Sequence, residues 1–446
     1  MAAWKAVPHY GTNSPFFARQ MARLAARLLA GEAHPAILEL GAGSGKFAAR
    51  FLHYFSRCFD RPFRYRATDF CQSNLDFLAG HPRLEPWISQ GTLELALFDA
   101  TRDQANGIDL TISNYLLGAL PQDLFLTEEG RLFAVETEPR SFPAEIARQP
   151  TSTPYRHEAW NSACLAQARR LRNGQFLFPV TAAGLWQRLG QSRWLVSDKG
   201  FLSAEEWTDY DRLPVVRHGG SLSLPVDFSL LGSTRQRTLS TPWAGEARFR
   251  TVLLGSEPVE TSPEMTVVDL IILWDLVAAA KAPPEVALSL VWLGECCPHL
   301  IQELTPLLRK APSAPLLTVL RASEQHLFEI PHGPSQPARS LAILYHLGGD
   351  FEKALEFYRQ LDPTPRLQLA MARCHQALGR VQEASRLVAP ASAADPTLDC
   401  RLPPPPSPPL RQPEAAPAVP LEPLLNWLAQ RELTPRQQLA FDRLRE

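Results

Sequence analysis

The sequence lacks several features that mark particular classes of protein. None of its apolar runs reaches the roughly 20 residues that a membrane-spanning helix needs, and the N-terminus has no signal-peptide core. The seven cysteines are an odd number and include no C-x-x-C pair, which argues against a disulfide framework and a zinc site. At a net charge of −1, no block of Lys and Arg points to nucleic acid or a membrane surface. These absences predict a cytoplasmic protein without a bound metal.

A glycine-rich turn organises the first half of the chain. Residues 36–40 suit a buried parallel strand, which runs directly into Gly41, Gly43 and Gly45, and a helical pattern begins at Phe47. A strand, a glycine turn and a helix in this order direct backbone N–H groups and the positive end of the helix at one ligand. Glycine is needed because the backbone turns sharply and the ligand must approach without a Cβ in the way.

Polar residues close the strands that follow. These strands and their closing residues are 63–68 with Asp69, 92–98 with Asp99 and Ala100, and 108–112 with Ser113 and Asn114. Other strands are expected over 122–126 and 131–137 as a hairpin, over 192–197 and over 222–228. Because parallel strands end at one edge, the pattern predicts a doubly wound α/β sheet with its ligand at the switch point. Asp69 would accept both hydroxyls of a ribose, and Asp99 with Ala100 would meet an adenine edge.

Two nucleoside cofactors fit this arrangement, NAD and S-adenosylmethionine (SAM). The dinucleotide fingerprint G-x-G-x-x-G has a two-residue gap before its last glycine. Residues 39–45 instead read E-x-G-x-G-x-G, so SAM is favoured and an NAD-linked oxidoreductase is the weaker alternative. The turn from Gly41 to Gly45 would hold the methionine moiety, and Glu39 would contact its ammonium or a supporting amide.

The same residues resemble the first four motifs of class I SAM-dependent methyltransferases. Narrower features, over roughly residues 8–232, resemble the MidA-like branch of that family. They are the segments Tyr10-Gly11-Thr12-Asn13-Ser14-Pro15-Phe16-Phe17, Asn114-Tyr115-Leu116-Leu117-Gly118-Ala119-Leu120-Pro121 and Val226-Asp227-Phe228, with Asp198 and Gly200 also matching by position. The resemblance implies that SAM is the cofactor, that Tyr10 and Thr12 belong to a segment closing over it, and that the acceptor is an arginine of another protein.

An arginine acceptor needs an acidic residue that orients its guanidinium and favours its deprotonation. The MidA-like pattern has two acids in the element that begins at Asn114, but this chain has Tyr115 and Gly118 at those positions. Either the acceptor differs, or other acids such as Glu136 or Asp227 supply the carboxylate, or activity is lost. With Asn114, Glu136 and Asp227 are the expected catalytic residues.

Sheet-like patterning fades after about Gly255, and an internal repeat follows in 338–390. Leu341, Ala342, Tyr345, Gly349, Phe351 and Ala354 are matched by Met371, Ala372, His375, Gly379, Val381 and Ala384. The repeat resembles a tetratricopeptide repeat with a period shorter than that family's 34 residues, which implies a surface for a protein partner. A proline-rich stretch at 401–420 then predicts an extended linker.

The expected fold is an α/β, doubly wound Rossmann-like methyltransferase sheet followed by an α-helical repeat domain. The expected segments are a methyltransferase-like domain at 1–260, a helical region at 261–336, tetratricopeptide-like repeats at 337–390, a proline-rich linker at 391–420 and a C-terminal helix at 421–446. The expected function is SAM-dependent methylation of a protein recruited by the repeats. The alternative is a SAM-binding scaffold or sensor without methyltransferase activity, acting as a protein-interaction module.

Overall fold

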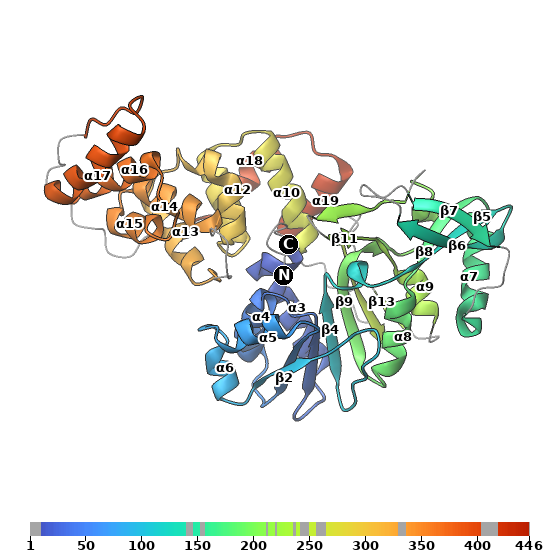
Figure 1. Cartoon of the computed structure of the whole chain (residues 1–446). Helices are drawn as coiled ribbons and strands as arrows, with labels where there is room; N and C mark the ends of the chain where they lie inside the picture. Colours follow the sequence, from blue (N-terminus) through green and yellow to red (C-terminus); the bar gives the residue numbers. More distant parts are fainter. Residues whose placement is uncertain are drawn as a thin grey trace. The chain divides into compact units, whose positions relative to one another are not determined.

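The structure, a computed structural model, describes residues 10–139, 146–151, 157–210, 213–218, 221–234, 238–240, 249–255, 265–328, 336–402 and 418–445. The chain divides into two compact units, which are described separately below. The first contains residues 1–13 and 17–268, and the second contains residues 14–16 and 269–446. Figure 1 shows the central strands of the first unit and the helices of the second.

A sheet in the order β13-β14-β9-β4-β1-β2-β3 forms the centre of the first unit (Figure 1). The strands are β1 (Ala36–Leu40), β2 (Arg64–Asp69), β3 (Leu93–Leu97), β4 (Leu110–Asn114), β9 (Arg193–Phe201), β13 (Thr238–Ser240) and β14 (Phe249–Gly255). Strands β1, β2, β3, β4 and β9 pair in parallel, and β13 and β14 are antiparallel. The chain runs outward from β1 in one direction and from β4 in the other, which is the doubly wound arrangement predicted from the sequence.

The register of the sheet brings the closing residues of the strands together. Leu40 lies opposite Thr68 in β2 and opposite Ser113 in β4. Asp69 and Asn114 therefore leave the sheet beside the glycine turn, at the switch point between β1 and β4. The antiparallel β14 next to β9 departs from the all-parallel order of dinucleotide-binding sheets, which argues against the NAD alternative.

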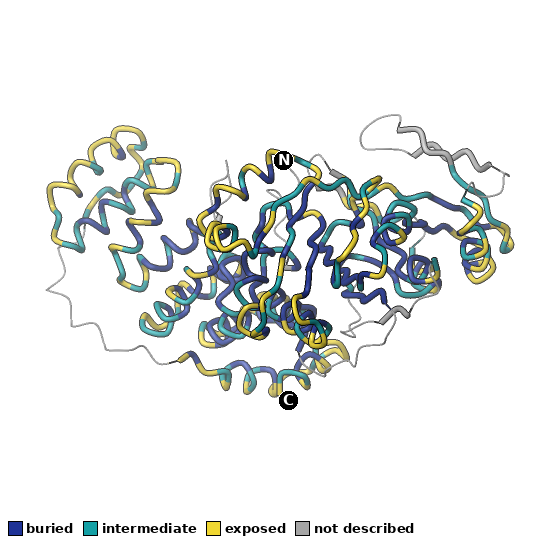
Figure 2. Tube along the Cα trace, turned by 90° about the horizontal axis from the view of Figure 1, so that it is seen from below, coloured by how far each residue is buried: buried dark blue, intermediate teal, exposed yellow. Residues whose placement is uncertain are grey.

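Helices before and between the first strands pack by aromatic side chains. They are α2 (Tyr10–Asn13), α3 (Pro15–Leu28), α4 (Lys46–Cys58), α5 (Gln72–Ala79) and α6 (Glu85–Ser89). Phe47, Phe51 and Phe55 recur every four residues, so they form one face of α4. Their rings are 5.6 and 5.2 Å apart, and Phe51 is 5.4 Å from the ring of Tyr65 in β2. Figure 2 shows that much of the chain at the centre of the picture is buried.

A second, antiparallel sheet follows β4 in the order β7-β6-β5-β8. Its strands are β5 (Asp123–Glu128), β6 (Arg131–Pro139), β7 (Ile146–Thr151) and β8 (Gly174–Phe178), and the short helix η1 (Leu117–Ala119) and the helices α7 (Glu158–Leu171) and α8 (Val180–Arg188) lie near it in the sequence. Glu129 and Gly130 join β5 to β6 with φ values of 51° and 80°. Two positive φ values suit a tight two-residue turn, so the predicted hairpin is confirmed.

The strand predicted over 222–228 is wrong. Two short strands, β11 (Ser221–Ser223) and β12 (Val226–Asp227), replace it, and α9 (Phe228–Ser233) begins at once. β11 pairs with β10 (Val216–His218), whereas β12 pairs with β9. Pro225 separates the two strands because it has no N–H to donate to a sheet.

The second unit is helical. Its helices are α10 (Val267–Ala279), α11 (Pro284–Leu293), α12 (Pro298–Leu308), α13 (Ser313–Glu324), α14 (Gln336–Gly348), α15 (Phe351–Tyr358), α16 (Pro365–Ala377), α17 (Val381–Ala394), α18 (Glu422–Ala429) and α19 (Pro435–Arg445). Gly349 and Gly379 join the pairs α14–α15 and α16–α17 with φ values of 86° and 74°. These matching turns carry the internal repeat, while its assignment to the tetratricopeptide family stays a prediction.

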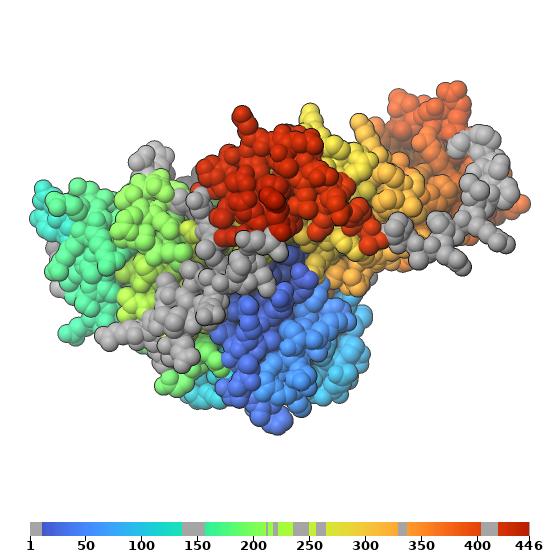
Figure 3. All heavy atoms as spheres, turned by 180° about the vertical axis from the view of Figure 1, so that it is seen from behind, coloured from blue at the N-terminus to red at the C-terminus, as the bar shows by residue number. Residues whose placement is uncertain are grey.

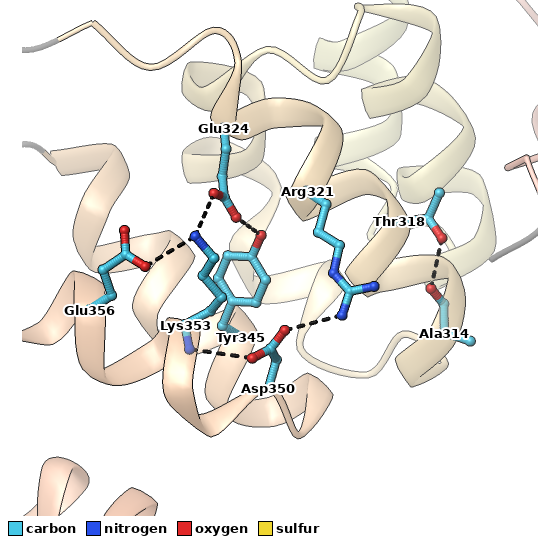
Figure 4. A network of polar contacts seen from close by, with 8 residues as sticks. All are labelled: Ala314, Thr318, Arg321, Glu324, Tyr345, Asp350, Lys353 and Glu356. Atoms are coloured by element: carbon cyan, nitrogen blue, oxygen red, sulfur yellow. Dashed lines mark hydrogen bonds and ion pairs between the residues drawn. The ribbon is translucent and has the colours of Figure 1, made fainter. Parts of the chain in front are cut away.

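Ion pairs connect helices of the second unit across the repeat (Figure 4). Arg321 Nη2 lies 3.2 Å from Asp350 Oδ2, and Lys353 Nζ lies 3.0 Å from Glu324 Oε2. Between α15 and the start of α17, Arg380 Nη1 donates to Glu352 Oε2 at 3.2 Å. Exposed pairs contribute little stability each, about 1 kcal/mol or less, so they serve mainly to align neighbouring helices.

The C-terminal helices return to the start of the second unit. Arg443 Nη1 lies 2.9 Å from both carboxylate oxygens of Asp269, and Ser289 Oγ donates to the carbonyl of Pro420 at 2.7 Å. Figure 3 shows α18 and α19, in red, against the yellow helices of the same unit. Among the described residues, no helix combines the length and the apolarity that crossing a bilayer requires.

Candidate functional site

The glycine turn between β1 and α4 has the backbone conformation that its sequence predicts. Gly41, Gly43 and Gly45 have φ values of 72°, 54° and 74°. An L-residue with a Cβ pays about 1–2 kcal/mol for this left-handed conformation, so glycine is strongly favoured at all three positions. The N–H of Ala42 donates to the carbonyl of Thr68 at 2.7 Å, which ties the turn to β2.

Asp69 holds the glycine turn in place. Its Oδ2 accepts the N–H of Gly43 at 3.0 Å, and its Oδ1 accepts the N–H of Cys71 at 2.9 Å. The residue is only 4% exposed. Because an ionised carboxylate has about four acceptor sites, two of them stay available for ribose hydroxyls. The sequence predicted the ligand role of Asp69 but not this structural one.

Glu39 is enclosed by the sheet. Its Oε2 accepts the hydroxyl hydrogen of Tyr65 at 2.9 Å, and the residue is 2% exposed. Burial raises the pKa of Glu39 to about 8, the Tyr65 hydrogen bond opposes the shift, and the charge of Asp69 adds to it. Glu39 therefore carries a proton at neutral pH in this structure. The expected contact of Glu39 with a ligand ammonium stays a prediction.

Glu39→Gln is expected to remove a pH dependence of stability. Because its pKa is raised from 4.5 to about 8, the folded protein holds a proton that the unfolded chain has released. The free energy of unfolding therefore falls as pH rises through this window, by about 1.4 kcal/mol per unit of pKa shift. Glutamine keeps the acceptor for Tyr65 but cannot ionise.

Urea unfolding measured at several pH values checks this expectation. Above about pH 7 the buried Asp198 and Asp227 have largely ionised, so the remaining slope up to about pH 8 belongs mainly to Glu39. The exposed Glu94, whose carboxylate lies 2.9 Å from Arg66 Nη2, provides the control variant Glu94→Gln. An unchanged slope in Glu39→Gln would contradict the expectation.

Two exposed apolar side chains stand at the same edge of the sheet. Phe70 follows Asp69 and is 81% exposed, and Leu97, opposite Asp69 in the register, is 56% exposed. Such exposure is unusual for large apolar groups and marks a surface that a flat apolar ring could cover. Neither residue was predicted as functional, although a phenylalanine directly after the acidic end of a strand was a usable signal.

Asp99 and Ala100, which were predicted to meet an adenine edge, form hydrogen bonds that fix the segment after β3. Asp99 Oδ1 accepts the N–H and hydroxyl of Thr101 at 2.9 and 2.6 Å. The hydrogen bonds from Thr101 lower the pKa of Asp99. The carbonyl of Ala100 accepts Arg188 Nη2 at 2.6 Å. The structure places both residues just after β3, near the exposed Leu97.

A cavity of about 470 Å³ lies against β1, β2 and β3. Leu38, Arg66 and Thr68 contribute to its wall. Thr68 lies on the opposite face of β2 from Asp69, whereas Leu97, which also lines the cavity, pairs with Asp69 and lies on the same face as Asp69.

Asn114, at the end of β4, has an unsatisfied acceptor. Its Nδ2 donates to the carbonyl of Gly11, and its Oδ1 has no partner among the described residues although Asn114 is 8% exposed. A buried polar atom without a partner is costly and calls for an explanation such as a bound group. Gly11 packs closely under Phe249, since an added Cβ would lie 2.6 Å from Cζ at the end of that side chain. The segment with Tyr10 and Thr12 is thus tied to the end of β4.

Tyr115 continues from Asn114 in a strained conformation, with a φ of 58°. Its N–H donates to the carbonyl of Ser197 at 2.8 Å, and its ring stacks on Phe249 at 5.6 Å. Lys199 Nζ lies 5.8 Å from the centroid of the Tyr115 ring. Strained residues are concentrated at functional sites, which makes Tyr115 a candidate for the expected acceptor position.

Gly118 has no space for the acid that the MidA-like pattern carries there. A Cβ added at Gly118 would lie 2.6 Å from the backbone oxygen of Leu224 and 3.3 Å from Oδ1 of Asp198. Asp198 Oδ2 accepts the N–H of Gly118 at 3.0 Å, and Oδ1 accepts that of Lys199 at 2.8 Å. Burial raises the pKa of Asp198 to about 6, and these backbone hydrogen bonds oppose the shift. Sequence reasoning did not select Asp198 or Lys199 as site residues.

Asp227 has a structural role in place of the catalytic one expected from the sequence. It is fully buried and caps α9. Its Oδ1 accepts the Leu230 N–H at 2.9 Å and the Ser229 hydroxyl at 2.7 Å, and its Oδ2 accepts Trp207 Nε1 at 2.7 Å and Gln167 Nε2 at 2.9 Å. With all four acceptor sites used, nothing remains to bind an acceptor.

The side chain of Glu136 lies outside the described residues. The backbone of Glu136 belongs to β6, opposite Gln149 in β7, in the antiparallel sheet. The expected catalytic role of Glu136 therefore stays a prediction.

Comparisons with known proteins give distant likenesses. No protein-family model and no curated protein matches the chain. An uncharacterised protein from Burkholderia thailandensis has 18% identity and a TM-score of 0.38, over 51% of this chain and 63% of that one. A second protein from that organism, which belongs to the same superfamily as the first and is bound to S-adenosyl-homocysteine, has 18% identity and a TM-score of 0.37. The match covers 50% of this chain and 61% of that one.

A protein from Listeria monocytogenes assigned to the class I SAM-dependent methyltransferases has 10% identity and a TM-score of 0.30, over 58% of this chain and 65% of that one. The chain thus covers under two-thirds of the length of each of these structures. Its chemistry has to follow from its own side chains.

Proposed function

We propose that the first unit binds SAM at the switch point and is a methyltransferase. The observation that carries the proposal is the glycine turn, in which three left-handed glycines lead into α4 while the Asp69 carboxylate holds the N–H of Gly43. The unsatisfied Asn114 Oδ1 at the neighbouring strand end supports a ligand that carries a hydrogen-bond donor.

Each part of SAM has a candidate partner at this edge. The N-terminus of α4, with its positive dipole end, suits the methionine carboxylate. The methionine ammonium is a donor for Asn114 Oδ1, and the ribose hydroxyls suit the remaining acceptor sites of Asp69. Phe70 and Leu97 offer apolar area to the adenine ring. When bound, SAM supplies an electrophilic methyl group, so the protein must chiefly align donor and nucleophile and exclude water.

Gly43→Ala is the sharpest test of this site. The new Cβ would enter the approach of the ligand, so SAM affinity measured by calorimetry should fall at least about tenfold, or about 1.4 kcal/mol. Gly91→Ala is the matched control, because Gly91 also has a left-handed φ, 71°, but open space around it. Both variants place a Cβ on a residue with left-handed backbone, but only Gly43 belongs to the proposed SAM site. If a folded Gly43→Ala protein bound SAM as tightly as the wild-type protein, the assignment of the SAM site to the glycine turn would be wrong.

The expectation of a protein arginine acceptor has two parts. The stacked pairs α14–α15 and α16–α17 support recruitment of a protein, because repeat stacks present extended binding surfaces. Among the described side chains, the element after β4 offers no accessible carboxylate to a guanidinium, so the arginine part has little support.

The scaffold alternative keeps one favourable observation, the loss of both acids at Tyr115 and Gly118. Incubation with SAM labelled in its methyl group separates the two functions. Label transferred to an acceptor supports the methyltransferase. Binding of SAM without any transfer supports the scaffold or sensor.

A further inference from the structure

We propose that the methyl acceptor is a carboxylate, which Lys199 pairs with beside Tyr115. This inference rests on the proposed SAM-dependent methyl transfer and names the chemical class of its substrate. The product would be a methyl ester in place of a methylated arginine. The proposal follows from two features near the end of β4, the lack of an exposed carboxylate among the described residues and the positive charge of Lys199.

Near the end of β4, the Asp198 carboxylate is buried and is not exposed to an acceptor. Asp198 is 1% exposed, and its two oxygens accept backbone N–H groups of Gly118 and Lys199. Gly118 cannot carry a side chain, because an added Cβ would lie 2.6 Å from the backbone of Leu224. A nucleophile that must lose a proton, such as a guanidinium with a pKa above about 12, therefore finds no partner in Asp198.

Lys199 supplies a positive charge at the same place. Ser197 pairs with Asn114, so Lys199 lies two residues beyond the end of β4, with Nζ 5.8 Å from the Tyr115 ring. The residue is half-buried, and no carboxylate among the described residues forms an ion pair with Nζ. The carboxylate oxygens of the adjacent Asp198 accept backbone N–H groups, and the charge of Lys199 opposes the rise in the pKa of Asp198. A partly desolvated ammonium favours an anionic partner and repels a guanidinium.

A carboxylate fits both observations. Its pKa in water is about 4, so it is already ionised at neutral pH and needs no base. One carboxylate oxygen donates a lone pair to the methyl carbon, the methyl–sulfur bond breaks, and its electron pair goes to sulfur. The sulfonium becomes the neutral thioether of S-adenosylhomocysteine, the acceptor becomes a methyl ester, and no proton is transferred.

The test uses the full-length protein, methyl-tritiated SAM and an extract of the cells that produce the protein. Methyl esters release volatile methanol in alkali, whereas methylarginine is stable and is recovered after acid hydrolysis. We expect most transferred label to be alkali-volatile. Separating the extract by size before the reaction distinguishes a protein carboxylate from a small carboxylic acid.

Variants of Lys199 complete the test. Lys199→Met keeps the aliphatic stem but loses the charge, so alkali-labile transfer should fall at least about tenfold, as expected for one lost charge-assisted hydrogen bond. Lys199→Arg should restore part of the rate. SAM affinity should stay unchanged in both variants. Lys310→Met, at an exposed lysine of the second unit, is the matched control.

Each outcome separates the two proposals. Alkali-stable label, or an unchanged rate in Lys199→Met, overturns the carboxylate acceptor and leaves SAM binding intact. SAM binding without alkali-labile transfer to either size fraction overturns it as well. Failure of the wild-type protein to bind SAM in calorimetry removes the proposed function itself, and the inference falls with it.

Discussion

Asp69→Asn is expected to weaken binding of S-adenosylhomocysteine by about 10- to 100-fold. A hydrogen bond to a charged group contributes about 1.5–3 kcal/mol, and about 1.4 kcal/mol corresponds to one factor of ten. The same variant should also lower the stability of the ligand-free protein, because Asp69 accepts the N–H groups of Gly43 and Cys71. Asparagine has only one side-chain oxygen, so its NH2 group would face the N–H of either Gly43 or Cys71, and two donors cannot form a hydrogen bond. Calorimetry and urea unfolding measure the two effects separately.

An analogue of S-adenosylhomocysteine without the two ribose hydroxyls shows which contact matters. If Asp69 binds those hydroxyls, the variant should lose much less affinity for the analogue than for the complete ligand. Equal losses would mean that Asp69 acts only through the glycine turn. Asp76→Asn is the control, since Asp76 is an exposed residue of α5 whose Oδ1 accepts Gln72 Nε2 at 2.7 Å.

Gly118→Ala is expected to lower the free energy of unfolding by about 1–3 kcal/mol, the usual range for overpacking. The added Cβ would lie 2.6 Å from the backbone oxygen of Leu224, which cannot turn away as a flexible side chain would. The N–H of Leu224 also donates to the carbonyl of Gly118 at 2.9 Å, so the two backbones are locked together. Urea unfolding measures the loss.

Gly80→Ala is the matched control. Gly80 has an ordinary φ of −94°, and an added Cβ would meet no atom within 4 Å. Gly118→Asp should destabilise the protein more than Gly118→Ala, because the new carboxylate would approach the buried Asp198. A stable Gly118→Asp protein with raised arginine methylation would contradict both this account and the carboxylate proposal.

The sequence by itself determined the features that depend on neighbouring residues. Gly41, Gly43 and Gly45 are left-handed because steric limits act within a few atoms of each residue. The phenylalanines of α4 share one face because helical spacing puts them there. The doubly wound sheet followed from strands that end in polar residues, since parallel strands end at one edge.

Only the tertiary structure decided the surroundings of the proposed acceptor position. The alternating pattern over 222–228 predicted a strand, and the missing acids at Tyr115 and Gly118 made Asp227 a candidate catalytic acid. Gln167 and Trp207 nevertheless reach its carboxylate from other elements. The crowding at Gly118 comes from Leu224, and the charge beside Tyr115 comes from Lys199. These contacts join residues that are far apart in the chain. They depend on the order and register of the strands and on the path of the loops, which no local pattern encodes.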